Sequence, residues 1–206
     1  MRAHLRAGVA IYNAGHYHAA HDAWEDHWLD LPEGDDERFL HGLIQFTAAV
    51  HHARERNWSG ATGLADSARE YLDGLPREYR GVDVGAVCDY LAGLERDPER
   101  IERAPPLALT HESQSLALAD LKFDAAAVAA VVLAEEYGYD EAVLERAVEY
   151  ARADLAADET GSQFVTFVMD FAREGGQRAI IFQRLSEHVE RRRHRETDVE
   201  GLFEER

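Results

Sequence analysis

Apolar residues recur every three to four positions along most of this chain, and proline, glycine and asparagine separate the stretches that show this pattern. The spacing is typical of amphipathic helices, whereas the alternation of β-branched residues that indicates strands hardly occurs. Gly15 and Asn57 stand where the first and third helices are expected to end. In the first half of the chain the pattern predicts helices at residues 3–13, 16–31, 35–56, 59–75 and 83–96.

A proline-rich segment separates these helices from a second set. Residues 97–110 contain Pro98, Pro105 and Pro106, and we expect them to form a linker. Further helices are predicted at 124–137, 140–157 and 162–195, with Gly175 and Gly176 as a break in the last one. The sequence therefore predicts an all-α fold: an antiparallel helical bundle at residues 1–107, a C-terminal helical subdomain at 108–195 and a frayed tail at 196–206.

The charge of the chain narrows the classes of partner. The 206 residues include 40 acidic and 22 basic ones, which gives a net charge of −18, and Lys122 is the only lysine. Such a charge argues against a polybasic surface that binds nucleic acid or an anionic membrane. The single cysteine, Cys88, excludes an intramolecular disulfide and a four-cysteine zinc site.

The acidic residues are spread over both halves of the chain, and this favours a protein from a cell of very high salt. In molar salt the Debye length falls to about 3 Å, which screens the self-repulsion of an acidic surface. An acidic surface for a partner is the alternative, although it would more often form one patch. A halophilic source weakens the charge argument against nucleic acid. No apolar run reaches the ~18 residues of a membrane span, and the N-terminus lacks the pattern of a signal peptide, so we expect a cytoplasmic protein.

Histidines gather near the N-terminus: eight of the eleven lie within the first 52 residues. In the helix predicted at 16–31, His21, Glu25 and Trp28 follow at steps of four and three and so lie on one face, which His18 flanks. The next predicted helix carries a second such face. Its residues are His41, Gln45, Ala48 and His52. If the two helices pack antiparallel, imidazole, carboxylate and amide groups converge between them.

Two hypotheses account for this convergence. A histidine and a carboxylate four residues apart, here His21 and Glu25, can both reach one ion, with His52 as the first candidate for a third ligand and His18 or His41 as the next. Such a set suits Zn²⁺, Mn²⁺ or Fe²⁺ and can leave positions open for catalysis. Alternatively, Glu25 accepts a hydrogen bond from His21 or His52 in a buried network that fixes the helix register.

Two blocks of the sequence resemble the domain of unknown function 309 family. They are YNAGHYHAAHDAWEDHW (12–28) and GLIQFTAAVHHARERNWSGA (42–61), and the resemblance extends over about residues 5–107. It implies an all-α fold and carries the label of a predicted metal-dependent hydrolase. By the motif, the positions of interest are His21, Glu25, Gln45 and His52. His51 stands where the family often has an aromatic residue, so either His51 or His52 is expected to face the cluster.

The resemblance and the residues together leave two functions open. In a metal-dependent hydrolase, His21, Glu25 and His52 hold the ion and Gln45 orients a ligand or a small-molecule substrate. In a variant of this hypothesis Glu25 is the general base, and His18, His21 and His52 are the ligands. The alternative is a non-catalytic helical interaction module, in which the same residues lock the helices together and the protein acts through a surface, as a homodimer or with another protein.

Overall fold

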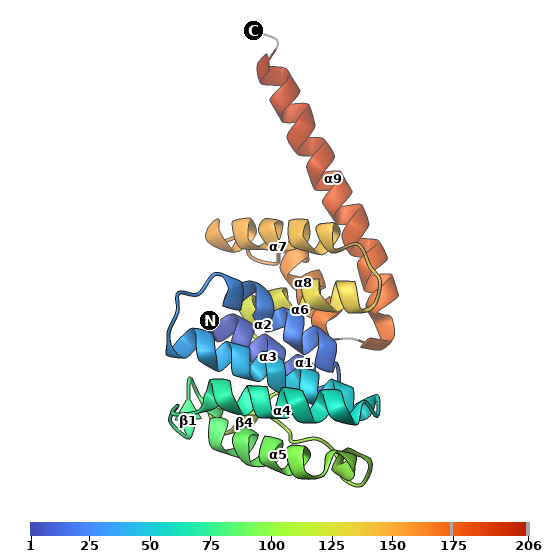
Figure 1. Cartoon of the computed structure of the whole chain (residues 1–206). Coiled ribbons are helices and arrows are strands. Elements are labelled where there is room, and N and C mark those ends of the chain that lie inside the picture. Colours follow the sequence, from blue (N-terminus) through green and yellow to red (C-terminus); the bar gives the residue numbers. More distant parts are fainter. Residues whose placement is uncertain (174, 205–206) are drawn as a thin grey trace. The chain divides into compact units, whose positions relative to one another are not determined.

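The structure is a computed structural model that describes residues 1–173 and 175–204, with side chains up to residue 197 (Figure 1). The helices are α1 (Arg2–Asn13), α2 (Tyr17–Leu29), α3 (Asp35–Arg54), α4 (Trp58–Leu72), α5 (Val84–Arg96), α6 (Phe123–Glu136), α7 (Glu141–Ala156), α8 (Gln163–Arg173) and α9 (Arg178–Glu204). The 3-10 helices are η1 (Pro98–Glu102), η2 (Leu118–Asp120) and η3 (Gly175–Gln177). The predicted all-α fold is confirmed.

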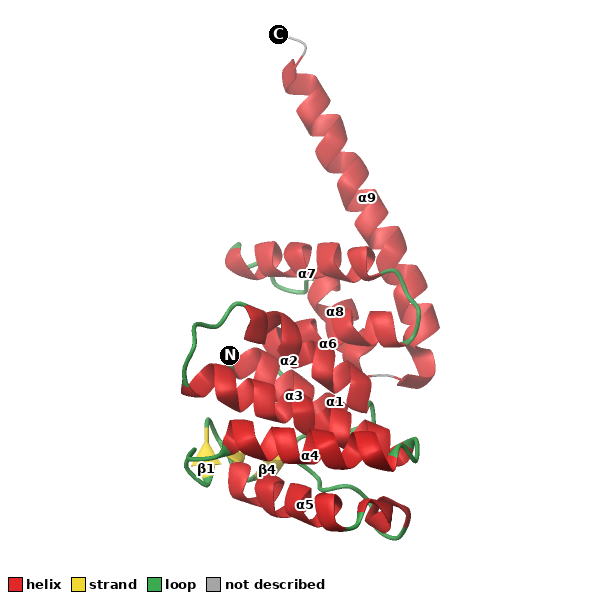
Figure 2. Ribbon diagram, viewed as in Figure 1, coloured by secondary structure: helices red, strands yellow, loops and turns green. Residues whose placement is uncertain are grey.

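Four strands of two residues each were not predicted. They are β1 (Glu78–Tyr79), β2 (Val82–Asp83), β3 (Thr110–His111) and β4 (Gln114–Ser115), and they pair antiparallel in the order β1-β2-β3-β4 (Figure 2). Two tight turns connect the paired strands. Arg80 and Gly81 form the turn between β1 and β2, Glu112 and Ser113 form the turn between β3 and β4, and all four residues have positive φ. Strands of two residues cannot show a period of two, so hydrophobic alternation could not reveal them.

The contacts divide the chain into two compact units, residues 1–129 and 130–206, whereas the sequence placed its boundary after residue 107. The segment beyond 107 belongs with the first unit because β3 pairs with β2, and because Asn13 holds the same hairpin. The side chain of Asn13 donates to the carbonyl oxygens of Leu109 and Leu116, at 2.9 and 3.0 Å, and accepts from the Leu109 N–H at 2.9 Å. The predicted linker thus contains η1 and leads into the sheet.

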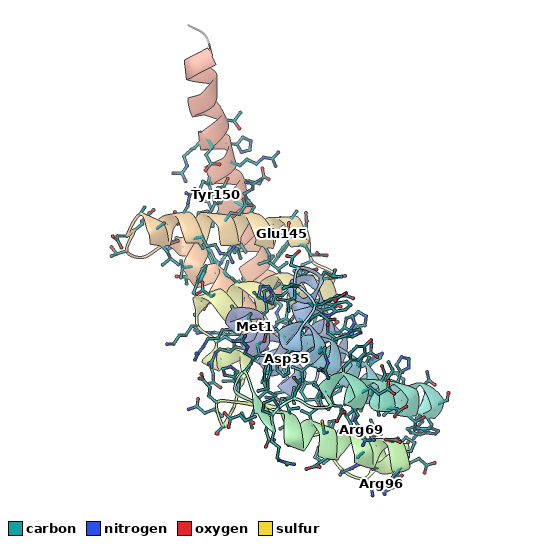
Figure 3. The ribbon with its side chains drawn as sticks, turned by 60° about the vertical axis from the view of Figure 1, so that its left-hand side comes forward. Met1, Asp35, Arg69, Arg96, Glu145 and Tyr150 are labelled. Carbon is teal, nitrogen blue, oxygen red and sulfur yellow. The ribbon has the colours of Figure 1, made fainter. Side chains whose placement is uncertain are left out.

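In the first unit, α1 to α5 pack in chain order, each helix against the next (Figure 1). Gly8 allows α1 to approach α2, since a Cβ at this position would lie 2.1 Å from Nε1 of the fully buried Trp24. Gly42 of α3 is covered by Leu72 of α4 in the same way. An ion pair of 2.6 Å from Arg69, labelled in Figure 3, to Glu95 joins α4 to α5.

The expectation that Asn57 ends the third helix is wrong. Arg56 takes the left-handed conformation there, with φ of 59°. Asn57 is instead the N-cap of α4, where its Oδ1 accepts the Gly60 N–H at 3.1 Å. Asparagine suits both positions, and a side-chain oxygen that satisfies a free N–H of the following helix is the stronger preference here.

In the second unit, α7, α8 and α9 pack against one another. The predicted break at Gly175 and Gly176 is confirmed, because η3 separates α8 from α9. The segment predicted as a frayed tail continues α9 to Glu204, and the last two residues lie outside the described part. The intrahelical pair Arg192–Glu196, at 3.4 Å, stabilises α9 up to residue 196. None of the described helices combines the length and apolar character that crossing a membrane requires.

Candidate metal centre

Three ligand-type side chains converge on one turn of α2. One donor atom each from His21, Asp22 and Glu25 lies within 4.8 Å of the other two, and all three residues are half-buried. The step of four residues places His21 and Glu25 on one face of the helix, as the sequence predicted, and Asp22 stands beside them. Among the described residues this is the one group of three or more His, Cys, Asp or Glu side chains so arranged.

Asp22 links the two histidines of this turn. His21 Nδ1 donates to Asp22 Oδ1 at 3.0 Å, and His18 Nδ1 donates to Oδ2 at 3.1 Å. The hydrogen bond to Asp22 raises the pKa of His21 above its usual value, against the effect of burial, and the charge of Glu25 adds to the rise. Burial acts to raise the pKa of Asp22, but His21 and His18 outweigh it, and the pKa lies below its usual value.

Glu25 is the most open member of the group. Its carboxylate lies 4.0 Å from His21 Nε2, which exceeds a hydrogen-bond distance, and its side chain is 43% exposed. Two ligands of one transition-metal ion lie about 3–4 Å apart, because each bond measures about 2.0–2.2 Å. The separation of Nε2 from the carboxylate therefore matches two ligands of one ion better than a direct contact.

The structure does not bring His52 into this group. Asn57 Nδ2 donates to His52 Nδ1 at 2.8 Å, so this ring is held by the residue that caps α4. His51 is turned toward α2 instead, since its ring centroid lies 6.2 Å from that of His18. The ring centroids of His52 and His51 lie 6.0 Å apart.

Gln45 and His41 belong to a second cluster, which joins α2, α3 and α4. The His41 ring packs against the rings of Tyr71 and Trp28. Its centroid lies 3.7 Å from that of Tyr71 and 4.5 Å from that of Trp28. Gln45 Nε2 donates to His41 Nε2 at 3.4 Å, which leaves the ring proton on Nδ1, 3.6 Å from Glu37. Trp28 Nε1 donates to the same carboxylate at 2.8 Å. This arrangement is that of a polar network between helices, and Gln45 contributes to it through His41.

Asp22 was not among the residues predicted for the site. It follows His21 directly, and a shared helix face is recognised from steps of three or four residues. The signal that was available is its spacing from His18, which is four residues and so permits the observed hydrogen bond.

Comparisons with known proteins find similarity to one family and to two uncharacterized proteins. Residues 5–64 match the family described as "Domain of unknown function (DUF309)". An uncharacterized protein of Aquifex aeolicus (strain VF5) is 24% identical over 87 residues, which cover 42% of this chain and 26% of that protein. The uncharacterized protein YpuF of Bacillus subtilis (strain 168) is 23% identical over 117 residues, which cover 56% of this chain and 67% of YpuF.

The matched family segment contains most of α1, the whole of α2 and α3 and the start of α4, and therefore the whole of the His21, Asp22 and Glu25 group. The resemblance noted from the two sequence blocks is confirmed over these residues. The chain spans about a quarter of the Aquifex protein that it matches. Residues 5–64 of this chain are therefore similar to the DUF309 family.

Proposed function

We propose that this protein binds a divalent transition-metal ion, Zn²⁺ or Mn²⁺, at His21, Asp22 and Glu25, and that it is a metal-dependent hydrolase of a small molecule. The observation that carries the proposal is the convergence of the three donor atoms within 4.8 Å on one half-buried turn. One imidazole nitrogen and two carboxylates suit these ions and leave coordination positions open. When bound, such an ion supplies Lewis acidity and lowers the pKa of water.

Each residue has a distinct task in this proposal. His21 coordinates through Nε2, because Nδ1 donates to Asp22. Asp22 fixes the orientation of that ring and offers a second carboxylate. Glu25, with no direct contact to His21, coordinates through its carboxylate or accepts a proton as a general base. His18 is a positioning residue, because it holds Oδ2 of Asp22.

The alternative function, a non-catalytic interaction module, is supported by the second cluster of Trp28, Glu37, His41, Gln45 and Tyr71. That cluster meets the description of a structural network, and it accounts for Gln45 without catalysis. It does not account for Glu25, whose exposed carboxylate makes no hydrogen bond to His21. For this reason the α2 group favours metal binding, while the second cluster is assigned to stability.

The decisive experiment compares two substitutions that change the charge equally on the same helix. Asp22→Asn alters the group, and Asp26→Asn alters an exposed residue beside it. We expect untagged wild-type protein and Asp26→Asn to hold about one equivalent of Zn²⁺ or Mn²⁺ by elemental analysis, and Asp22→Asn to bind at least about tenfold more weakly. Hydrolysis of p-nitrophenyl esters and phosphates should follow the metal content.

Equal metal content in the two variants would assign the ion to another place on the protein. If the wild type stays free of metal after incubation with both ions, the hydrolase proposal fails and the interaction module takes its place. If metal binds at the group but no ester or phosphate is hydrolysed, the hydrolase part alone fails.

The His18→Ala variant tests the positioning role. Alanine has no donor to replace the His18 hydrogen bond to Asp22, so we expect the metal affinity to fall about 10–100-fold while the stoichiometry stays the same. Titration with Zn²⁺ against a competing chelator measures the affinity. A change in stoichiometry would instead identify His18 as a ligand.

A further inference from the structure

The second unit contains a cleft of about 1010 Å³ that the proposed metal function does not use. It lies between the end of α7, the start of α8 and the middle of α9. Its lining includes Phe164 of α8 and the α9 residues His188, Arg191, Arg192 and Arg195. Ligand pockets for small organic molecules have volumes of about 300–1,000 Å³, so the space exceeds what a simple inorganic ion requires.

One wall of the cleft is a satisfied ionic network. Arg192 donates to Asp154 Oδ1 at 2.5 Å and to Glu196 at 3.4 Å, and its guanidinium lies 4.3 Å from the ring centroid of Tyr150. Tyr150, labelled in Figure 3, donates in turn to Glu196 at 2.6 Å. Ser162 donates to the other oxygen of Asp154. The charge of Arg192 is thus neutralised within the protein.

Two other arginines of α9 line the cleft and are less fully paired than Arg192. Arg195 donates its Nε–H to the carbonyl oxygen of Arg191 at 3.3 Å, and no described carboxylate lies within ion-pair distance of it. Arg191 donates Nε–H to the Glu187 carbonyl oxygen, and its Nη2 lies 3.8 Å from that residue's carboxylate. Among the described residues, the outer nitrogens of Arg195 have no carboxylate partner, and Nη1 of Arg191 remains beside the long pair that Nη2 makes with Glu187.

The pKa of His188 responds to the charged groups around it. Burial lowers its pKa below the usual value, Arg191 and Arg195 lower it further, and Glu187 acts in the opposite direction. The other charged groups of the cleft, Asp154, Glu159, Arg192 and Glu196, lie on its lining as well. Arg191 and Arg195 thus add positive potential at His188, which Glu187 partly offsets, in a chain whose net charge is −18.

His188 also offers a flat surface. Its ring packs against Phe167, with 5.1 Å between centroids, and lies 6.4 Å from Phe164. No described group forms a hydrogen bond with its ring nitrogens, so the N–H of the neutral ring can donate to a ligand. A guanidinium group binds phosphate through two parallel N–H···O hydrogen bonds. This geometry favours a phosphate group over a monovalent anion as the ligand.

We propose that this cleft binds an organic phosphate monoester, with its phosphate between Arg191 and Arg195 and its body beside the ring of His188. None of the residues that line this cleft belongs to the proposed metal centre on α2. The volume of the cleft favours an organic body, and the two arginines with available N–H groups favour a dianion.

The test is a calorimetric titration of the full chain with phenyl phosphate, in wild type and two variants of α9. Arg195→Gln removes a cation of the cleft, whereas Arg193→Gln removes a cation outside it, which pairs with Glu190 at 3.7 Å. We expect Arg195→Gln to weaken binding about tenfold or more, as the loss of one charged hydrogen-bonding group does, and Arg193→Gln to leave it within about twofold of the wild type.

NMR of His188 provides a second readout that does not depend on affinity. Saturation with phenyl phosphate should raise the pKa of His188, because the dianion stabilises the imidazolium. Inorganic phosphate should bind more weakly than phenyl phosphate, because it lacks the organic body. Equal effects of the two variants, an unchanged pKa of His188, or no binding of phenyl phosphate at millimolar concentration would each overturn the proposal.

Discussion

His4 of α1 and His27 of α2 form a stacked pair that is suited to the neutral state. Their ring centroids lie 4.8 Å apart at an interplanar angle of 15°, and His4 Nδ1 donates to the Ala23 carbonyl oxygen at 3.3 Å. Burial lowers the pKa of His4, and the charge of His27 lowers it further. The pKa of His27 is lowered by burial and by the N-terminal amine. The folded protein therefore binds protons at this pair less readily than the unfolded chain does.

The sign of the pH dependence follows from these lowered pKa values. The stabilisation by the neutral pair is complete above the unfolded value of 6.5, and it is lost as the pH falls below that value. We expect urea unfolding to show a drop in the free energy of unfolding between about pH 7.5 and about pH 5.5, and the drop should be smaller in His27→Asn. His21, with its raised pKa, acts in the opposite direction in both proteins and cancels in the comparison.

Asn13 and Asn57 can be compared directly, because both side chains form hydrogen bonds with backbone groups. Asn13 forms three hydrogen bonds with Leu109 and Leu116, and Asn57 caps one helix. At about 1 kcal/mol for each bond, Asn13→Ala should lower the free energy of unfolding by about 2–3 kcal/mol. Asn57→Ala should cost about 1 kcal/mol. Urea unfolding followed by circular dichroism measures both, and equal costs would contradict the role assigned to Asn13.

These two residues also show what a sequence reveals about a site. The face shared by His21 and Glu25 follows from helical spacing and was predicted. The binding of His52 to Asn57 was not, because it depends on which of two helices the asparagine caps. The contacts of Asn13 join positions 96 and 103 residues apart, and no local pattern encodes them.

At the scale of elements, the crossing of α1 and α2 depends on one glycine. A methyl group at Gly8 would overlap Trp24, which is fully buried. Gly63 in α4 offers the control, because a Cβ there meets no atom within 4 Å. We expect Gly8→Ala to destabilise the protein by about 1–3 kcal/mol and Gly63→Ala to stabilise it by up to about 1 kcal/mol.

Thermal unfolding of the two variants distinguishes packing from helix propensity. Both substitutions add the same atoms to a helix, so propensity alone would stabilise both. A stabilised Gly8→Ala variant would show that α1 and α2 do not approach as closely as described.

The helices themselves were predictable because each presents an apolar face with recognisable ends. Asp83 and Asp140 are N-caps whose side chains accept the N–H groups of Ala86 and Ala142. The four short strands were not predictable, since their pairing depends on turns and on the return of residues 110–115 to β2.

At the scale of the whole molecule, the net charge of −18 dominates the response to salt. Several ion pairs are exposed and contribute little stability, such as Arg77–Asp89 at 3.3 Å. General repulsion among carboxylates is larger in sum and is screened as the Debye length shortens. We therefore expect the melting temperature to rise by several degrees between low salt and molar NaCl or KCl. A fall over this range would show that the ion pairs outweigh the repulsion among carboxylates.

The hydrogen bonds of Asn13 with residues 109 and 116 also affect folding during synthesis. A ribosome releases α1 long before Leu116 exists, so the amide of Asn13 has to wait for about a hundred further residues before it finds its partners. During that interval α1 to α5 can assemble, but the hairpin that closes over the end of α1 is missing. Completion of the first unit is thus tied to the synthesis of the segment beyond the prolines.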